Sequence, residues 1–130
     1  MPDLHNKRYL VLGGETPPGR AIVIALAERG AGVAIASLTP STEAEFAINS
    51  ALNELWALGR QGLALVIDAS DAAALRDAVA RAERDLGALD ATIAIDGAAI
   101  ADEALEGRRV VIVPEDGTAE EALQKLIADR

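Results

Sequence analysis

A glycine-rich turn near the start of the chain carries residue types that can hold a phosphate group. Gly13, Gly14 and Gly19 follow a short apolar run, and a helical pattern comes directly after them. Backbone N–H groups in such a turn bind phosphates together with the positive end of the helix. Pro17 and Pro18 stand inside the same turn, and proline has no N–H to donate. The spacing therefore predicts a phosphate-binding turn that lacks two of its donors.

The missing donors and an acid in the same turn both weaken the binding of a phosphate. Losing one hydrogen bond to a charged group costs roughly 1.5–3 kcal/mol, which corresponds to about one to two orders of magnitude in affinity. Glu15 adds a carboxylate that we expect to face the phosphate charge. A second interpretation is that Pro18 simply begins the helix, where proline is well tolerated. The two interpretations are compatible.

Carboxylates gather at the expected ends of the strands, and such a cluster could bind Mg²⁺, which prefers oxygen ligands. The acids in question are Glu15, Asp68, Asp96, Glu115 and Asp116. Solvated loops and helix N-termini explain the same acids, so we expect no metal site. His5, the single histidine, has no recognisable catalytic setting, and the absence of cysteine excludes thiol chemistry and disulfides.

The residues above must be positioned by an alternation of strands and helices. Short runs rich in β-branched residues alternate with longer helical patterns, which is typical of βαβ units. The expected strands are residues 9–12, 33–36, 63–67, 91–95 and 110–113. Nearly unbroken apolar strands require helices on both faces, as in a parallel sheet. We therefore expect an α/β fold in which a single domain over residues 1–130 forms a three-layer, doubly wound parallel sheet of about five strands in the order 3-2-1-4-5.

Four helical patterns accompany the strands. They begin at about Pro18, Thr42, Asp71 and Thr118. Thr42 with Glu45, and Thr118 with Glu121, have the spacing of a capping box. We expect Trp56 to extend the buried stripe of the second helix, and the last helix to fold back beside the first.

The balance of charge excludes two classes of partner. The chain has 21 acidic against 12 basic residues, a formal net charge of −9. Nucleic-acid binding needs Lys and Arg to neutralise phosphates, and an anionic membrane would repel the chain for the same reason. No apolar run approaches the roughly 20 residues of a membrane span, and residues 1–8 lack an apolar signal core. We expect a cytoplasmic protein with no nucleic-acid or membrane partner.

Residues 9–22 read Tyr-Leu-Val-Leu-Gly-Gly-Glu-Thr-Pro-Pro-Gly-Arg-Ala-Ile, a strand, a glycine turn and the start of a helix. This stretch resembles the opening of a short-chain dehydrogenase/reductase, with its Thr-Gly-x-x-x-Gly-x-Gly turn. The resemblance continues through residues 27–37, 57–60, 67–71 and 86–90 and covers about residues 7 to 97. It implies a Rossmann-like domain and a site for NAD or NADP.

The resemblance also implies which residues would bind that cofactor. They are Gly13, Gly14, Gly19, Ser37, Asp68, Ala69 and Gly97. The second strand should end in an acid for NAD or be followed by Arg for NADP, and Ser37 with Leu38 encodes neither preference. Asp68 and Ala69 correspond to residues that bracket the adenine, although Asp68 is equally explained as a turn residue at a strand end. Gly97 is the one residue retained from the family's Asn-Asn-Ala-Gly motif.

The family's proton-transfer residues do not occur in this sequence. The resemblance implies a Tyr-x-x-x-Lys pair, but the only tyrosine is Tyr9, inside the first strand, and the only lysines are Lys7 and Lys125. Pro114 and Glu115 follow the fifth strand, where the family has its catalytic Ser. We therefore expect a non-catalytic short-chain-dehydrogenase-like domain, a pseudoenzyme with a structural or interaction role.

Two other functions stay open. One is an NAD(P)-binding, oxidoreductase-like module with a weakened dinucleotide site, which the retained helix start and Asp68 favour. The other is an NAD(P)-dependent oxidoreductase whose catalytic residues come from another chain. The paired prolines with Glu15 favour the non-catalytic interpretation.

The fifth strand suggests a partner chain. Only about ten residues connect Gly97 to Gly107, close to the minimum for a crossover, where the family places a long helix that commonly builds its dimer interface. The fifth strand then becomes an edge with unpaired backbone groups, and residues 98–106 alone cover one face of the fourth and fifth strands. We expect a homo-oligomer, a dimer, that buries this side.

Overall fold

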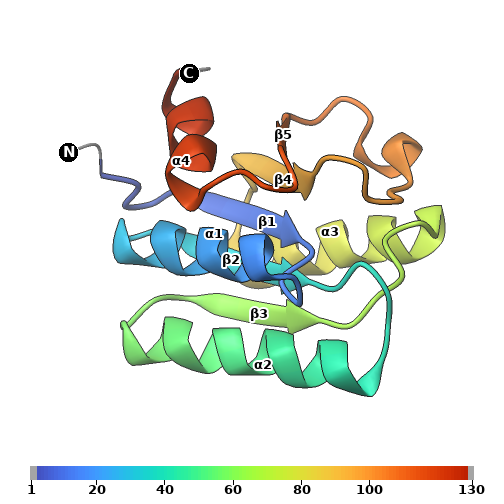
Figure 1. Cartoon of the computed structure of the whole chain (residues 1–130), viewed down its shortest axis with the longest axis horizontal. Coiled ribbons are helices and arrows are strands. Elements are labelled where there is room, and N and C mark those ends of the chain that lie inside the picture. The colour runs from blue at the N-terminus through green and yellow to red at the C-terminus, as the bar shows by residue number, and fades with distance from the viewer. Residues whose placement is uncertain (1–2, 129–130) are drawn as a thin grey trace.

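Five parallel strands form the sheet of the computed structural model, which describes residues 3–128 (Figure 1). The strands are β1 (Arg8–Leu12), β2 (Gly32–Ala36), β3 (Gly62–Leu65), β4 (Ala91–Ile95) and β5 (Val110–Val113). Their order is β3-β2-β1-β4-β5, and Tyr9 of β1 pairs with Val33 on one side and Ala91 on the other. The expected order and the three-layer α/β architecture are confirmed.

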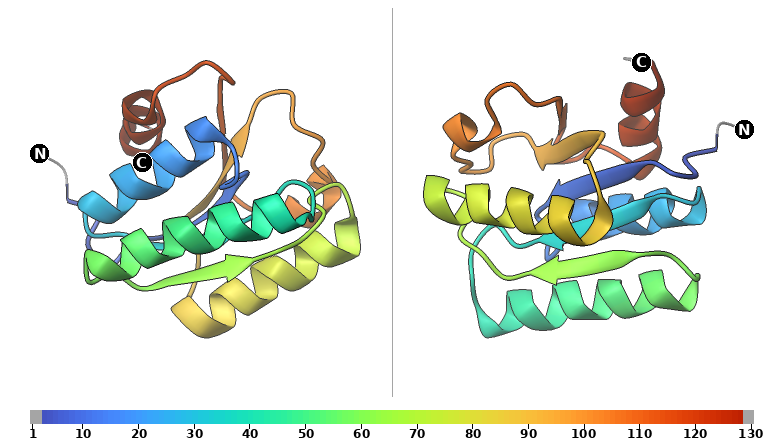
Figure 2. Two further views of the ribbon diagram at one scale, coloured as in Figure 1. Left: turned by 60° about the horizontal axis from the view of Figure 1, so that its bottom comes forward. Right: turned by 180° about the vertical axis from the view of Figure 1, so that it is seen from behind.

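Helices cover the sheet on both faces (Figure 2). The elements are α1 (Pro17–Glu28), α2 (Thr42–Ala57), α3 (Ala72–Leu86), the 3₁₀ turn η1 (Asp102–Leu105) and α4 (Ala119–Ala128). Helices α1, α2 and α4 bury one apolar cluster against the sheet, and α3 with η1 buries the other. The last helix packs beside α1, as expected. No helix of residues 3–128 is long and apolar enough to cross a membrane.

Two helix starts differ from the sequence-based expectation. Helix α1 begins one residue early, with Pro17 and Pro18 in its first two positions and Thr16 as its N-cap. The N-cap of α2 is Ser41, because its hydroxyl accepts the N–H of Ala44 at 2.9 Å. Thr42 is already helical and cannot cap, so the predicted capping box at that position is wrong.

The two remaining helix starts agree with the sequence pattern. The Asp71 carboxylate accepts the N–H groups of Ala73 and Ala74 and caps α3. Before α4, the hydroxyl of Thr118 accepts the N–H of Glu121 at 3.2 Å. Each hydrogen bond satisfies a donor that the first helical turn leaves without an intrahelical partner.

Strand β3 ends two residues earlier than the apolar run 63–67 suggests. The reason lies just after β2, where the buried Ser37 hydroxyl donates to the carbonyl of Ile67 at 2.7 Å and accepts its N–H at 2.8 Å. A side chain therefore replaces the backbone ladder at that point.

Trp56 does not extend the buried stripe of α2, contrary to expectation. Its side chain is 56% exposed, whereas Ile48, Leu52 and Leu55 are buried. One residue on a helix turns the side chain by about 100°, so Trp56 lies beyond the rim of the face that ends at Leu55.

One face of β5 is left open by the helices of residues 3–128. Val110 and Ile112 are 37% and 45% exposed, while Val111 and Val113 are buried under α1 and α4. On the open side, Ala101 and Leu105 of the connecting segment pack into the α3 cluster. The expectation that apolar strands are covered on both faces is therefore wrong for β5.

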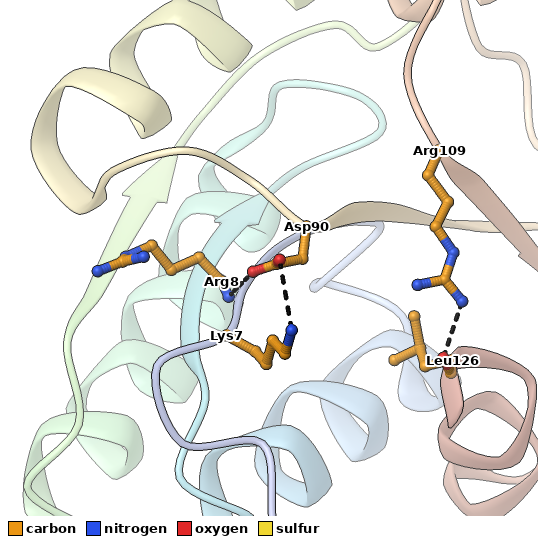
Figure 3. A network of polar contacts seen from close by, with 5 residues as sticks. All are labelled: Lys7, Arg8, Asp90, Arg109 and Leu126. Carbon is orange, nitrogen blue, oxygen red and sulfur yellow. Dashed lines mark hydrogen bonds and ion pairs between the residues drawn. The ribbon is translucent and has the colours of Figure 1, made fainter. Parts of the chain in front are cut away.

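Two cations fasten α4 to this edge of the sheet. The Arg109 guanidinium donates to the carbonyl of Leu126 at 2.8 Å (Figure 3). The ammonium of Lys125 donates to the carbonyl of Ile112 at 2.7 Å. Since the N–H groups of Thr92 and Asp96 take the carbonyls of Arg109 and Val113, the Ile112 carbonyl points away from β4, and Lys125 covers it.

Candidate functional site

The residues singled out in the sequence converge at the carboxyl ends of β1 to β4. A hollow of about 450 Å³ lies there, lined by Thr16, Pro17, Pro18, Leu38, Ile95, Asp96, Gly97, Ala98 and Glu115. It opens between the ends of β1 and β4, where the order of the strands reverses. Ligands of open α/β sheets bind at such a switch point.

Within the turn of residues 13–19, four of the backbone N–H groups are bound to acceptors of the chain itself. The N–H groups of Gly13 and Gly14 both donate to the carbonyl of Ala36, at 2.8 and 3.2 Å. The N–H of Thr16 donates to the carbonyl of Gly13 at 2.9 Å, and the N–H of Gly19 donates to the hydroxyl of Thr16 at 3.1 Å. With prolines at 17 and 18, the start of α1 offers a phosphate little that is not already engaged.

The glycines of this turn are required by close backbone approaches. A Cβ on Gly19 would lie 1.9 Å from the carbonyl oxygen of Gly13, and a Cβ on Gly14 would lie 2.2 Å from Cγ2 of Ile35. Gly13 itself has a φ of +101°, a conformation that favours glycine. Packing alone therefore explains the glycine pattern, whether or not a phosphate binds.

Glu15 does not face the phosphate position, contrary to the expectation from the sequence. Its carboxylate reaches across to the segment after β2, where Oε2 accepts the N–H of Leu38 at 2.8 Å and that of Thr39 at 3.3 Å. Oε1 lies 3.1 Å from the same Leu38 nitrogen. The hydrogen bonds join two loops that are 23 residues apart, so no local pattern could have revealed them.

Leu38 also closes the space above the glycine turn. A Cβ placed on Gly13 would meet Cδ1 of Leu38 at 3.3 Å and Cδ1 of Ile95 at 3.2 Å. Two apolar side chains thus lie over Gly13, and Leu38 was not among the expected site residues. The sequence pattern indicates only that Leu38 supplies neither the acid typical of NAD sites nor the arginine typical of NADP sites.

Ser37 lies on the inner side of this edge and not in the hollow. Its side chain is fully buried and both of its hydrogen-bonding functions are used by Ile67. These two hydrogen bonds connect the segment after β2 to the segment after β3.

Asp68 and Ala69 follow at the end of β3. One oxygen of Asp68 accepts both the hydroxyl of Ser70 at 2.6 Å and the N–H of Ser70 at 2.9 Å. The hydrogen bond from the Ser70 hydroxyl, and to a smaller extent that from the Ser70 N–H, holds the pKa of the Asp68 carboxyl below its usual value. Ala69 is buried, its N–H bound to the carbonyl of Leu38 and its carbonyl to the N–H of Ala101. The hydrogen bonds of Asp68 to Ser70 are those of a turn residue at a strand end, which was one of the two interpretations of Asp68 from the sequence.

Gly97 borders the hollow beside Asp96 and Glu115. It has a φ of +84°, and a Cβ there would have no atom within 4 Å apart from those of its chain neighbours. Among residues 3–128, no group of three or more His, Asp or Glu side chains is arranged to hold a metal ion.

A second hollow, of about 330 Å³, lies at the opposite edge of the sheet and includes His5, Lys7, Arg8 and Arg60 in its lining. Its cations are partly engaged within the chain. Lys7 lies 3.9 Å from the Asp90 carboxylate, which also accepts the backbone N–H of Arg8 at 2.8 Å (Figure 3). Nε of Arg60 donates to the carbonyl of Ala27. This second hollow lies at the amino ends of the strands, whereas the candidate site lies at their carboxyl ends.

Comparison with known proteins identifies relatives of most of the chain. The family model described as short chain dehydrogenase matches residues 7–110. The uncharacterized oxidoreductase YghA of Escherichia coli is 35% identical over 98 residues, which make up 75% of this chain and 32% of that protein.

Solved structures agree with that match. A blue fluorescent protein from a metagenomic library, crystallised in complex with NADPH, is 34% identical with a TM-score of 0.66, over 71% of this chain and 36% of that one. A short-chain dehydrogenase/reductase from Serratia marcescens is 33% identical with a TM-score of 0.64, over 72% and 36%. The chain thus spans about a third of the length of the relatives that it matches.

Proposed function

The chain belongs to the short-chain dehydrogenase family, and from that premise we propose that these 130 residues form a non-catalytic member with a structural or interaction role. The observation that carries the proposal is the state of the phosphate turn. Its backbone donors at Gly13, Gly14, Thr16 and Gly19 are bound to acceptors of the chain itself, and two positions at the start of α1 are prolines.

The chemistry of the residues supports the same proposal. The one tyrosine, Tyr9, is buried in β1, and Lys7 and Lys125 lie near the amino end of β1 and on α4. None of the three lies at the carboxyl ends of the strands, so this chain supplies no Tyr–Lys pair to transfer a proton to a carbonyl.

For the interaction role we propose a second copy of this chain as the partner. Val110 and Ile112 leave a branched apolar strip exposed on β5, and apolar strips of this kind are buried in dimer interfaces. Lys125 already covers the outward carbonyl of Ile112, so we expect contact through the face of β5 and not by extension of the sheet. A cytoplasmic location remains a prediction from composition.

The decisive experiment is a calorimetric titration of the purified chain with NAD and with NADP, followed by an assay for turnover with a panel of carbonyl substrates. We expect no turnover, and dinucleotide binding at least ten times weaker than in a catalytically active relative measured in parallel. Tight saturable binding of either dinucleotide, or reduction of any carbonyl above the buffer rate, would overturn the proposal.

A weakened nucleotide site is the second candidate function, and one observation favours it. The 450 Å³ hollow at the switch point remains open, and the carboxylates of Glu15 and Asp68 lie near the strand ends where the adenosine half of a dinucleotide would bind. A relative of known structure was crystallised with NADPH. Such a site would recognise the adenosine half more strongly than the pyrophosphate.

A further inference from the structure

The carboxylate of Glu15 lies at the end of β2, although Glu15 belongs to the loop after β1. Its two oxygens lie 2.8 and 3.1 Å from the backbone nitrogen of Leu38, and Oε2 also accepts the N–H of Thr39. The segment after β2, residues 37–41, reads Ser-Leu-Thr-Pro-Ser and carries no charge of its own. The neighbouring loop therefore delivers a negative charge to a strand end whose own sequence has none.

A charge at this position distinguishes between two classes of nucleotide. In dinucleotide-binding sheets, an acid at the end of the second strand accepts hydrogen bonds from the ribose hydroxyls, whereas a ribose 2′-phosphate needs a cation there. An ionised carboxylate has about four lone-pair positions. The N–H groups of Leu38 and Thr39 use only part of them, so Glu15 can still accept a ribose hydroxyl.

The same geometry disfavours a phosphate twice. The carboxylate repels a second anion placed within a few ångströms of it. It also occupies the N–H groups of Leu38 and Thr39, which are the backbone donors that a phosphate at this strand end would otherwise use. Both effects act just after β2, where Leu38 borders the hollow, and they are independent of the prolines in the phosphate turn.

We propose that Glu15 is a specificity-determining residue, which makes the site accept adenosine nucleotides with a free ribose 2′-hydroxyl and reject those with a 2′-phosphate. The proposal rests on the second candidate function, the weakened nucleotide site, and states which class of nucleotide that site takes. It also revises the sequence-based conclusion that Ser37 and Leu38 leave the site without a preference.

Two probes that differ only in the 2′-phosphate test the proposal directly. They are 5′-AMP and adenosine 2′,5′-bisphosphate, titrated into the ¹⁵N-labelled chain while amide resonances are followed by NMR, which measures weak binding. We expect 5′-AMP to shift the amides of Leu38 and Thr39, and the bisphosphate to bind at least about tenfold more weakly. The experiment is run at low ionic strength, because salt screens the charge effect.

The test variant is Glu15→Gln, which keeps an oxygen to accept the N–H of Leu38 and removes the charge. We expect the preference for 5′-AMP to fall to about twofold or to reverse. Glu28→Gln is the matched control, since Glu28 is an exposed glutamate at the other end of α1, and it should keep the wild-type preference.

The outcomes separate the two proposals. If neither nucleotide shifts any resonance of the wild-type chain, the nucleotide site is disproved and the specificity of Glu15 with it. If both nucleotides bind the wild type equally, or if Glu15→Gln keeps the full preference, the site stands and the role of Glu15 is disproved.

Discussion

Single residues at the carboxyl ends of the strands have structural roles that do not depend on a ligand. Gly19 lets α1 start directly against the carbonyl of Gly13, and Gly14 lets the turn lie on Ile35. The Thr16 hydroxyl donates to the carbonyl of Gly13 at 2.6 Å and caps α1 through Gly19. Packing therefore requires glycine at these positions of the turn whether or not a phosphate binds there.

Gly19→Ala tests this packing. The new Cβ would overlap the carbonyl oxygen of Gly13, at 1.9 Å, so we expect the free energy of unfolding to fall by about 2 kcal/mol or more. Urea denaturation followed by circular dichroism measures it. Gly32→Ala is the matched control, because the nearest atom to its Cβ would be 3.6 Å away, and it should change stability little.

Glu83 makes the stability of the chain depend on pH in the acidic range. Its carboxylate accepts from Arg108 at 2.9 Å and from the N–H of Leu89 at 3.1 Å, and the Arg108 hydrogen bond is the main cause that lowers the pKa of Glu83 below 4.5. As pH falls past 4.5, the unfolded chain takes up the proton first, so the contribution of Glu83 is fully present above that pH and is lost below it.

We therefore expect Glu83→Gln to flatten the decrease in the free energy of unfolding below about pH 4.5. The pair is partly exposed, with side-chain accessibilities of 38% and 30%, so the difference should be about 1 kcal/mol or less. Urea denaturation over a series of pH values measures it. Arg108→Gln should reproduce most of the effect, and an unchanged pH dependence in both variants would contradict this account.

At the scale of elements, the ends of strands and helices are set by side chains as much as by backbone pattern. Ser37 ends the ladder between β2 and β3 by binding Ile67. Ser41 begins α2 one residue before the threonine that the sequence motif suggests. In both cases a serine hydroxyl accepts a backbone N–H at the boundary of an element, from Ile67 after β3 and from Ala44 in the first turn of α2.

The cap of α2 is testable with two neighbouring substitutions. We expect Ser41→Ala to lower the free energy of unfolding by about 1 kcal/mol, because the N–H of Ala44 loses its acceptor. Thr42→Ala should cost less than about 0.5 kcal/mol, since Thr42 is exposed and lies inside the helix. Thermal and urea denaturation of both variants decide between them, and a larger loss for Thr42→Ala would restore the capping box.

At the scale of the whole molecule, coverage of the sheet is uneven. Helices α1, α2 and α4 shield one face from β3 to β5, and α3 with η1 shields the other only as far as β4. The strip formed by Val110 and Ile112 is therefore the part of the sheet that a second chain could still bury. A two-fold dimer would place the same strip of each copy in contact.

Ile112→Lys tests this association. A buried lysine without a counter-charge is strongly unfavourable, so we expect the wild type to elute as a dimer at micromolar concentration and Ile112→Lys as a monomer, by size-exclusion chromatography with light scattering. Phe46→Lys is the control, because Phe46 is 78% exposed on α2 and should leave the dimer intact. A monodisperse wild-type monomer would argue against the interface.

The sequence by itself determined the elements and their order. Apolar runs, the glycine turn and the aspartate cap of α3 act over a few residues. A pattern within β1 and α1, or at Asp71, therefore carries the signal for its own local structure. The parallel order β3-β2-β1-β4-β5 followed from the alternation of strands and helices with right-handed crossovers, which is typical of a doubly wound sheet. The prolines at 17 and 18 were likewise visible without any coordinates.

Only the tertiary structure decided where the charges and open surfaces lie. Glu15 belongs to the phosphate turn, yet its carboxylate binds the loop after β2. Trp56 is exposed although its neighbour Leu55 is buried. The open face of β5 depends on where residues 98–106 pack, which no local pattern records. Side-chain reach and the meeting of distant loops are properties of the assembled sheet, because they depend on distances between segments that the linear order does not contain.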